Sequence, residues 1–156
     1  MTAAAALRIV VPMSLHLIKL CVGCPSVEDL RARQSQRLAD MRRRGEAARL
    51  AHVTRMMPRR ADELLDGGSL YWVIKGHVLA RQALIGIEPF RDSDGVGRCR
   101  LVLGEDVVEV RPRPLRAFQG WRYLVAADAP PDLAGRAPGD AMPDEMRREL
   151  AELGLL

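Results

Sequence analysis

The sequence predicts an α+β domain whose short strands form a small, strongly bent β-sheet or pseudobarrel with two to three short helices. Six or seven short segments have the β-branched, aromatic or alternating pattern of strands, and glycine or proline separates them. Two helical segments lie near the start of the chain, at 26–44 and 59–66. Several short strands must curl to cover their edges, which favours a bent sheet or a barrel over a flat sheet.

The length of the chain favours a single domain. With 156 residues, of which 48% are hydrophobic and 28% charged, it has the size and balance of one globular core. Residues 1–12 contain an alanine run and are expected to be a disordered extension, because Met13 directly precedes the first apolar segment. We expect the domain at 13–133 and a linker with a short C-terminal helix at 134–156.

The first two elements are a strand and a capped helix. An apolar run at 15–22 has no helical period and predicts a buried strand. Ser26 and Asp29 then form a capping box, and apolar side chains recur at helical spacing up to Gly45, which closes the helix. Its other faces carry six arginines, a pattern typical of a solvated helix face, with a binding role as the alternative.

The remaining elements are short and are separated by turn residues. Two strands are expected to form a hairpin about Gly104, and Pro112 and Pro114 are expected to end the strand pattern that follows it. Gly67-Gly68 and Gly76 mark further turns. In order, the predicted elements are strand 50–57, helix 59–66, and strands 69–75, 83–90, 98–103, 106–111 and 118–125.

The charge is unevenly distributed along the chain. The net charge is +4, but residues 1–126 carry 21 basic and 13 acidic side chains, and residues 127–156 carry 3 and 7. Only Lys19 and Lys75 are lysines, so nearly all the positive charge is arginine, which binds phosphate and stacks on flat rings. A nucleic-acid partner is one explanation for this composition, and a coding sequence that favours arginine codons is the other.

Nothing in the sequence predicts export, a membrane segment or a cofactor. No apolar stretch reaches the roughly 18–20 residues of a membrane helix, which favours a cytoplasmic protein without membrane contact. Cys21 and Cys24 have the spacing of a redox pair or of half a zinc site, but Cys99 and the three histidines offer no second ligand pair. We therefore expect no metal and no redox cycle at these cysteines.

Five of the six aromatic side chains fall in two clusters surrounded by arginine. Tyr71 and Trp72 form the first cluster, and the second consists of Phe118, Trp121 and Tyr123. Proteins that bind single-stranded nucleic acid combine stacking rings with arginines that reach phosphates, whereas the alternative role for such rings is core packing. Strand alternation places Tyr71 and Lys75 on one face, so Tyr71 is expected to be exposed and Trp72 buried.

The predicted nucleic-acid contacts combine the first aromatic cluster with the polar residues around it. They are Arg55, Arg59, Arg60, Tyr71, Lys75, Arg81 and Gln82. The partner that they suit is single-stranded RNA or a nucleotide.

Catalytic motifs are sparse in the sequence. Ser69 does not lie in a nucleophile elbow, and no glycine-rich phosphate loop is present. One alternative function is a small hydrolase or nucleotide-processing enzyme, in which Glu63 or His52 acts as the base and Lys75 or Arg81 holds an anion. Another is a protein-interaction module that docks through the acidic tail or the first helix.

Several long strings resemble one family. They are LHLIKLCVG at 15–23, HVTRM at 52–56, RADELLDGGSLYWVIKG at 60–76, ARQ at 80–82 and FQGWRYL at 118–124. These strings resemble the uncharacterised alphaproteobacterial family of domain of unknown function 1489, over roughly residues 13–133. The order of elements is also similar to that of the PUA-like pseudobarrels, which often bind RNA. This similarity implies an RNA- or modified-nucleotide-binding domain, by analogy of fold alone.

Overall fold

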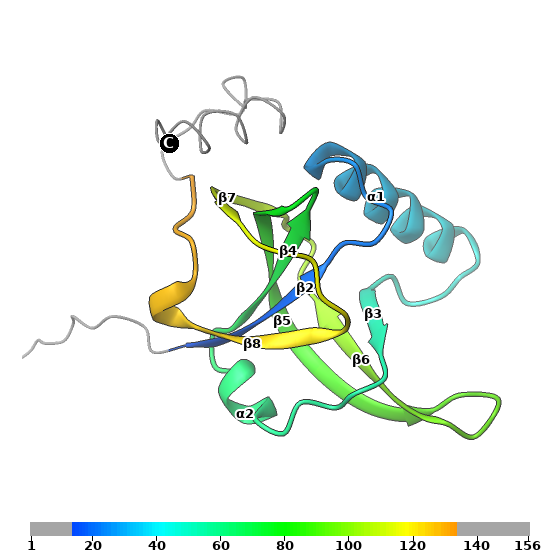
Figure 1. The fold of residues 1–156 in the computed structure, drawn as a ribbon. Helices are drawn as coiled ribbons and strands as arrows, with labels where there is room; N and C mark the ends of the chain where they lie inside the picture. Colours follow the sequence, from blue (N-terminus) through cyan, green and yellow to red (C-terminus); the bar gives the residue numbers. More distant parts are fainter. Residues whose placement is uncertain (1–13, 134–156) are drawn as a thin grey trace, which may run out of the picture.

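Seven strands and two α-helices make up residues 14–133, the part of the chain that the computed structural model describes (Figure 1). The α+β class is therefore confirmed. The expectations for residues 1–12 and 134–156 lie outside the described residues. The elements are β2 (Leu15–Leu20), α1 (Val27–Arg43), β3 (Leu50–Thr54), α2 (Ala61–Leu64), β4 (Ser69–Ile74), β5 (His77–Arg91), β6 (Gly97–Leu103), β7 (Val108–Pro114), β8 (Trp121–Val125) and a 3-10 turn at Ala126–Asp128.

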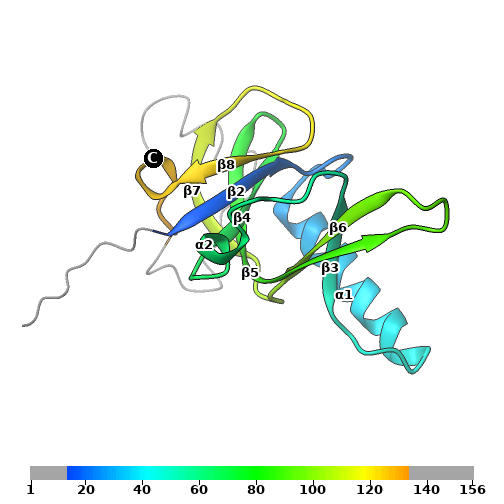
Figure 2. The ribbon, with the colours of Figure 1, turned by 90° about the horizontal axis from the view of Figure 1, so that it is seen from below.

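The seven described strands form one bent sheet that is not closed. Its order is β3-β6-β5-β4-β2-β8, with β7 paired to β5 beside this path. The pair β2–β4 is parallel, and the other pairs are antiparallel. The long strand β5 pairs with β4 and β7 through its first half and with β6 through its second half. Its pairing register shifts between Leu84 and Gly86, and such an irregularity bends a strand. The sheet therefore folds around β5, as Figures 1 and 2 show.

Helix α1 begins and ends where its sequence predicts. The Ser26 side chain accepts a hydrogen bond of 3.0 Å from the backbone N–H of Asp29, which satisfies one of the free donors of the first turn. Glu28 and Asp29 lie in that turn, and basic residues lie in the last turn, as the helix dipole prefers. Its apolar side chains Val27, Leu30 and Leu38 are buried against the sheet.

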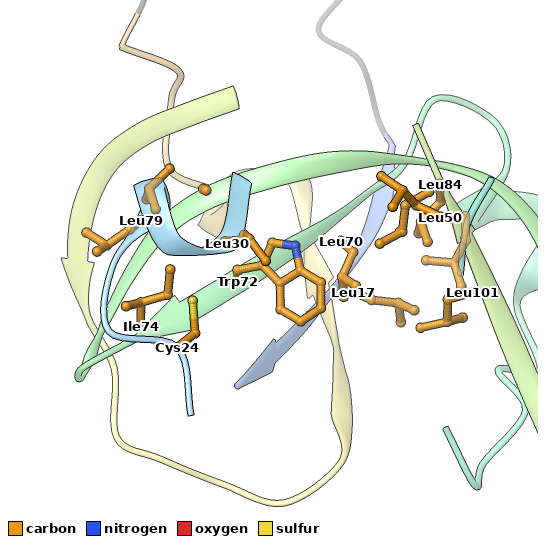
Figure 3. Packing of buried hydrophobic residues seen from close by; sticks show 14 of the residues in the cluster. Leu17, Cys24, Leu30, Leu50, Leu70, Trp72, Ile74, Leu79, Leu84 and Leu101 are labelled. Carbon is orange, nitrogen blue, oxygen red and sulfur yellow. The ribbon is translucent and has the colours of Figure 1, made fainter. Parts of the chain in front are cut away.

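The main core lies between α1 and the inner face of the sheet, which we define as the face that carries Leu17, Leu70 and Trp72. Figure 3 shows these side chains packed together with Leu30 of α1. Trp72 is only 3% exposed, so the prediction that it is a core ring is confirmed. Burial of a leucine such as Leu17, Leu30 or Leu70 stabilises a fold by about 1.5–3 kcal/mol relative to leaving the side chain exposed.

A second cluster covers the opposite, outer face of the same strands. It is formed by Ile18, Tyr71, Val73, Val78 and Val110. Side chains of the β7–β8 connection, of β8 and of the turn after it pack on this cluster. Tyr71 is consequently only 4% exposed, and the expectation that it presents a free ring is wrong.

Two expectations about strand pairing are also wrong. Strands β6 and β7 follow each other in the chain but do not form a hairpin, because both pair with β5, at its two ends. β7 continues through Pro112 to Pro114, whereas the sequence predicted that these prolines end the pattern. Proline is compatible with a strand that has a ladder partner on one side only, and β7 has its ladder with β5 and a single bridge from Val110 to Asp132.

The open side of the sheet is spanned by side chains of β8. The Trp121 indole N–H donates to the Met56 carbonyl at 2.8 Å, and the Tyr123 hydroxyl accepts from the Arg60 N–H at 3.1 Å. These contacts tie β8 to the segment that joins β3 to α2. Among the described residues, no helix is long and apolar enough to cross a membrane.

Candidate functional site

A cavity of about 180 Å³ lies between α1 and the inner face of the sheet, beside the edge strand β3. The turn after β2, helix α1, and strands β3, β4 and β6 contribute side chains to it. An apolar cavity of about 150 Å³ holds a benzene molecule, so this space accepts one aromatic ring but not a drug-sized ligand. The lining residues are Cys21, Val22, Leu30, Arg33, Gln34, Arg37, Leu50, Ala51, His52, Trp72 and Leu103.

Two rings form one wall of the cavity. Trp72 comes from β4 and His52 from β3, and their ring centroids are 5.3 Å apart at an interplanar angle of 85°. This edge-to-face geometry is favourable between aromatic rings and holds both in place. The two rings are therefore held nearly perpendicular to each other and form a rigid corner of the cavity.

His52 is the titratable group of this wall. Burial, with the nearby charges of Lys19 and Arg37, lowers its pKa to about 4, so the ring is neutral at pH 7. Its Nε2 atom is buried and has no hydrogen-bond partner among the described residues. A buried polar atom without a partner is costly, and a ligand that hydrogen-bonds to it would remove that cost.

A pair of glutamines adjoins the rings. Gln34 of α1 and Gln82 of β5 exchange two hydrogen bonds of 2.8 Å each. Gln82 also accepts from the Trp72 indole N–H at 2.8 Å and donates to the Gly104 carbonyl at 3.0 Å. Gln82 is 0% exposed, so it cannot touch a nucleic acid as the sequence predicted.

Among the described residues, the charged side chains that line the cavity are all basic. Arg33 and Arg37 stand one helical turn apart on α1, and no acidic residue of the segment 14–133 is among the lining side chains. Arg33 is paired with Asp29 at 2.6 Å and donates to the Gly23 carbonyl, and Arg37 lies 3.4 Å from the Ala51 carbonyl. The arrangement combines a neutral, ring-sized space with guanidinium groups at its border.

The other predicted contacts are not brought together around this cavity. Arg55, Arg59 and Arg60 are exposed on the segment before α2, at the end of the sheet where β4 begins. Lys75 is exposed in the turn after β4, at the opposite end of that strand. The Arg60 side chain is already paired with Glu63 through two hydrogen bonds of 2.6 Å.

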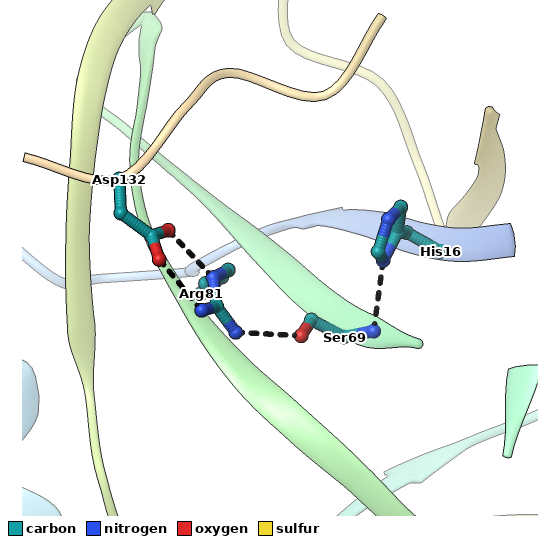
Figure 4. Close-up of polar contacts among 4 residues, drawn as sticks. All are labelled: His16, Ser69, Arg81 and Asp132. Carbon is teal, nitrogen blue, oxygen red and sulfur yellow. Dashed lines mark hydrogen bonds and ion pairs between the residues drawn. The ribbon is translucent and has the colours of Figure 1, made fainter. Parts of the chain in front are cut away.

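Arg81 also has internal partners. Figure 4 shows its guanidinium between the Asp132 carboxylate and the Ser69 hydroxyl, with nitrogen–oxygen distances of 2.7, 2.7 and 3.0 Å. The Ser69 backbone N–H donates to His16 Nδ1 at 3.0 Å. In this arrangement Arg81 fastens the segment after β8 to the sheet, and its charge is compensated by Asp132.

The residues of the hydrolase alternative are also separated. Glu63 is exposed, is paired with Arg60 and does not line the cavity that contains His52. Of the cysteines, Cys21 lines the cavity, and burial raises the pKa of its thiol, which disfavours the reactive thiolate. Cys21, Cys24 and Cys99 are free thiols in residues 14–133, where no group of three potential metal ligands occurs.

Sequence reasoning did not identify Arg33, Gln34 and Arg37 as a group. Positions 33 and 37 are four apart and therefore share a face of α1, a signal that the arginine-rich helix contained. The sequence does not show that this face turns toward β3.

Comparison with known protein families shows which family this chain belongs to. The family described as Protein of unknown function (DUF1489) matches residues 17–156. The chain belongs to this family. The DUF1489 match includes every residue that lines the cavity, and it continues beyond residue 133, where the resemblance was expected to end. No curated protein and no solved structure matches the chain.

Proposed function

We propose that this DUF1489 domain binds single-stranded RNA and takes one unstacked base, ordinary or modified, into the cavity beneath α1. The observation that carries the proposal is the cavity itself, which has the volume of one ring and is walled by Trp72 and His52. RNA-binding proteins read unstacked bases by stacking and by hydrogen bonds to their edges. The Gln34 amide lines the cavity and supplies such a hydrogen-bonding group.

The charge around the cavity supports the phosphate part of the proposal. Helix α1 carries five arginines and three acids, and two of these arginines border the cavity. Arginine beside a base pocket neutralises the phosphates on either side of the bound nucleotide. Of the contacts that the sequence predicted, Arg55, Arg59 and Lys75 are exposed and remain candidate phosphate contacts on a longer strand.

The architecture that we assign to the domain is a PUA-like pseudobarrel. An initial strand followed by a helix, and a bent sheet with an open side, support this assignment. This assignment supports RNA binding by analogy of fold only, and the proposed function rests on the cavity.

The test is the binding of short, fluorescently labelled, single-stranded RNA by anisotropy at several salt concentrations. Binding should weaken with salt, and Arg37→Ala should reduce the salt dependence by about 0.7 in log–log slope, the value for one phosphate contact on a single strand. His52→Ala should lower the affinity at every salt concentration with little change of slope.

Arg91→Ala is the matched control for the charge change. Arg91 is exposed at the far end of β5 and does not line the cavity. Absence of binding at low salt, or cavity variants that behave as this control does, would contradict the proposed function.

A further inference from the structure

Gln82 is a fully buried polar side chain whose hydrogen-bonding capacity is completely used. Its Oε1 accepts from Trp72 Nε1 and from Gln34 Nε2, and its Nε2 donates to Gln34 Oε1 and to the Gly104 carbonyl. A primary amide has two acceptor positions and two donor hydrogens, so nothing is left over for a ligand. Such complete satisfaction removes the usual cost of burying an amide.

The partners of Gln82 allow its amide only one orientation. The indole nitrogen of Trp72 can only donate, so it must face the amide oxygen. The Gly104 carbonyl can only accept, so it must face the amide nitrogen. Exchanging the two ends of the amide would break both contacts and leave buried groups without partners.

Gln82 in turn fixes the orientation of Gln34. The Gln34 nitrogen and the Trp72 indole nitrogen both donate to Gln82 Oε1. The Gln34 nitrogen therefore lies on the side of Trp72, which lines the cavity. The Gln34 oxygen lies on the Gly104 side, toward the groove lined by Glu105 and Asp106. Within the described residues the Gln34 nitrogen has one acceptor, Gln82 Oε1, although it carries two hydrogens. Its second N–H is available at the cavity.

We propose that Gln82 is a positioning residue that makes the cavity selective for a base with an oxo group where cytosine has its amino group, by holding the Gln34 N–H as a donor toward the ligand. The inference rests on the proposed RNA binding and specifies the base. Uracil presents an oxygen acceptor at the position where cytosine presents an amino donor. An amino group facing the Gln34 N–H would leave two donors opposed and neither satisfied, which strongly disfavours that base.

The test compares short oligouridylate and oligocytidylate probes by fluorescence anisotropy. The parent protein should prefer oligouridylate by about tenfold, within the range for one specific base contact. Gln34→Ala should remove this preference, and the protein should fold because alanine favours a helix. Gln82→Met, which removes the amide but keeps the volume, should also bring the ratio of the two affinities close to one while RNA binding persists.

Gln36→Ala is the matched control, because Gln36 lies on the same helix, is exposed and bonds to Asp40 instead. The tenfold ratio should survive in this variant. The inference is overturned if the parent binds both probes equally or prefers oligocytidylate, or if the preference survives Gln34→Ala. In those cases the proposed RNA binding stands. Absence of binding to either probe overturns the proposed function and the inference with it.

Discussion

Arg81 and Asp132 are 51 positions apart in the chain and form a two-pronged ion pair, with both nitrogen–oxygen distances at 2.7 Å (Figure 4). Asp132 also bridges to Val110 of β7, so the pair fastens the segment after β8 to the sheet. We predict that Asp132→Asn lowers the free energy of unfolding by about 1 kcal/mol, because both groups are partly exposed and solvent weakens their attraction. Urea denaturation at pH 7 measures this change.

Acid should abolish the contribution of this pair. The Arg81 hydrogen bonds hold the pKa of Asp132 below its ordinary value of 3.8. The stabilisation is therefore complete above pH 3.8 and is lost as the pH falls through the lower pKa of the folded state. The difference between parent and Asp132→Asn should persist at pH 5 and shrink below pH 3.8. Asp128→Asn, in the same segment, is the control and should match the parent.

A second pH effect should come from His52. Its pKa is about 4 in the folded protein against 6.5 for a free histidine, so the unfolded chain binds the proton more strongly. Stability is unaffected above pH 6.5 and falls as the pH drops from 6.5 to 4, by up to about 3 kcal/mol. In an NMR titration, the His52 ring should not change its protonation between pH 8 and 6.

His52→Gln separates this effect from other acid-sensitive groups. Glutamine keeps a polar side chain of similar length but does not titrate, so the variant should lose less stability between pH 6.5 and 4 than the parent does. The pKa of His16 is also lowered by burial, and its share of the effect should remain in the variant. An identical pH profile for parent and His52→Gln would show that folding does not lower the pKa of His52.

The local elements were predictable because their signals are local. The capping box at Ser26 identified the start of α1, and Gly76 identified the turn between β4 and β5. The pairing of β6 and β7 with β5 rather than with each other was not predictable. It depends on the 15-residue strand β5, which pairs with β7 at one end and with β6 at the other. Strands that follow each other in the sequence normally pair. Here β5 pairs with both strands, so they do not pair with each other.

The errors about Tyr71 and Gln82 have physical causes that the sequence does not show. Alternation along β4 placed Tyr71 with Lys75, but Lys75 lies after the strand with φ of 50°, so the alternation ends before it. All six residues of β4 are buried, because both of its faces are covered. Gln82 is polar yet fully buried, since its partners come from three separate parts of the fold: β4, α1 and the turn after β6. A single sequence gives no sign of such partners.

Gly68 should tolerate no side chain. A Cβ atom there would lie 2.3 Å from the carbonyl oxygens of Leu15 and Leu64, and neither backbone can move without disturbing β2 or α2. We predict that Gly68→Ala costs about 1–3 kcal/mol or more, the range for overpacked positions. Gly97→Ala is the control, because no atom of the described residues lies within 4 Å of its added Cβ and its φ is not left-handed. Equal thermal stability of the two variants would contradict the close approach at Gly68.

The Tyr123 hydroxyl caps α2 from a distant part of the chain. Arg60 is the N-cap of this helix and has no side-chain cap of its own, and its N–H donates to Tyr123 at 3.1 Å. Tyr123→Phe removes the acceptor and keeps the ring, so we predict a loss of about 1 kcal/mol. The effect should be local: the Arg60 amide should exchange with solvent faster, by up to about tenfold, while core amides of β4 change less.

The control for this change is Tyr71→Phe. Its hydroxyl makes no hydrogen bond within residues 14–133, so its removal should leave the exchange of the Arg60 amide unchanged. If Tyr123→Phe also leaves that exchange unchanged, water replaces the hydroxyl at no cost, and β8 does not close the open side of the sheet through this bond. If the Arg60 amide alone responds, the connection between β3 and α2 is held by β8, as the Trp121 bond to Met56 in the same segment also indicates.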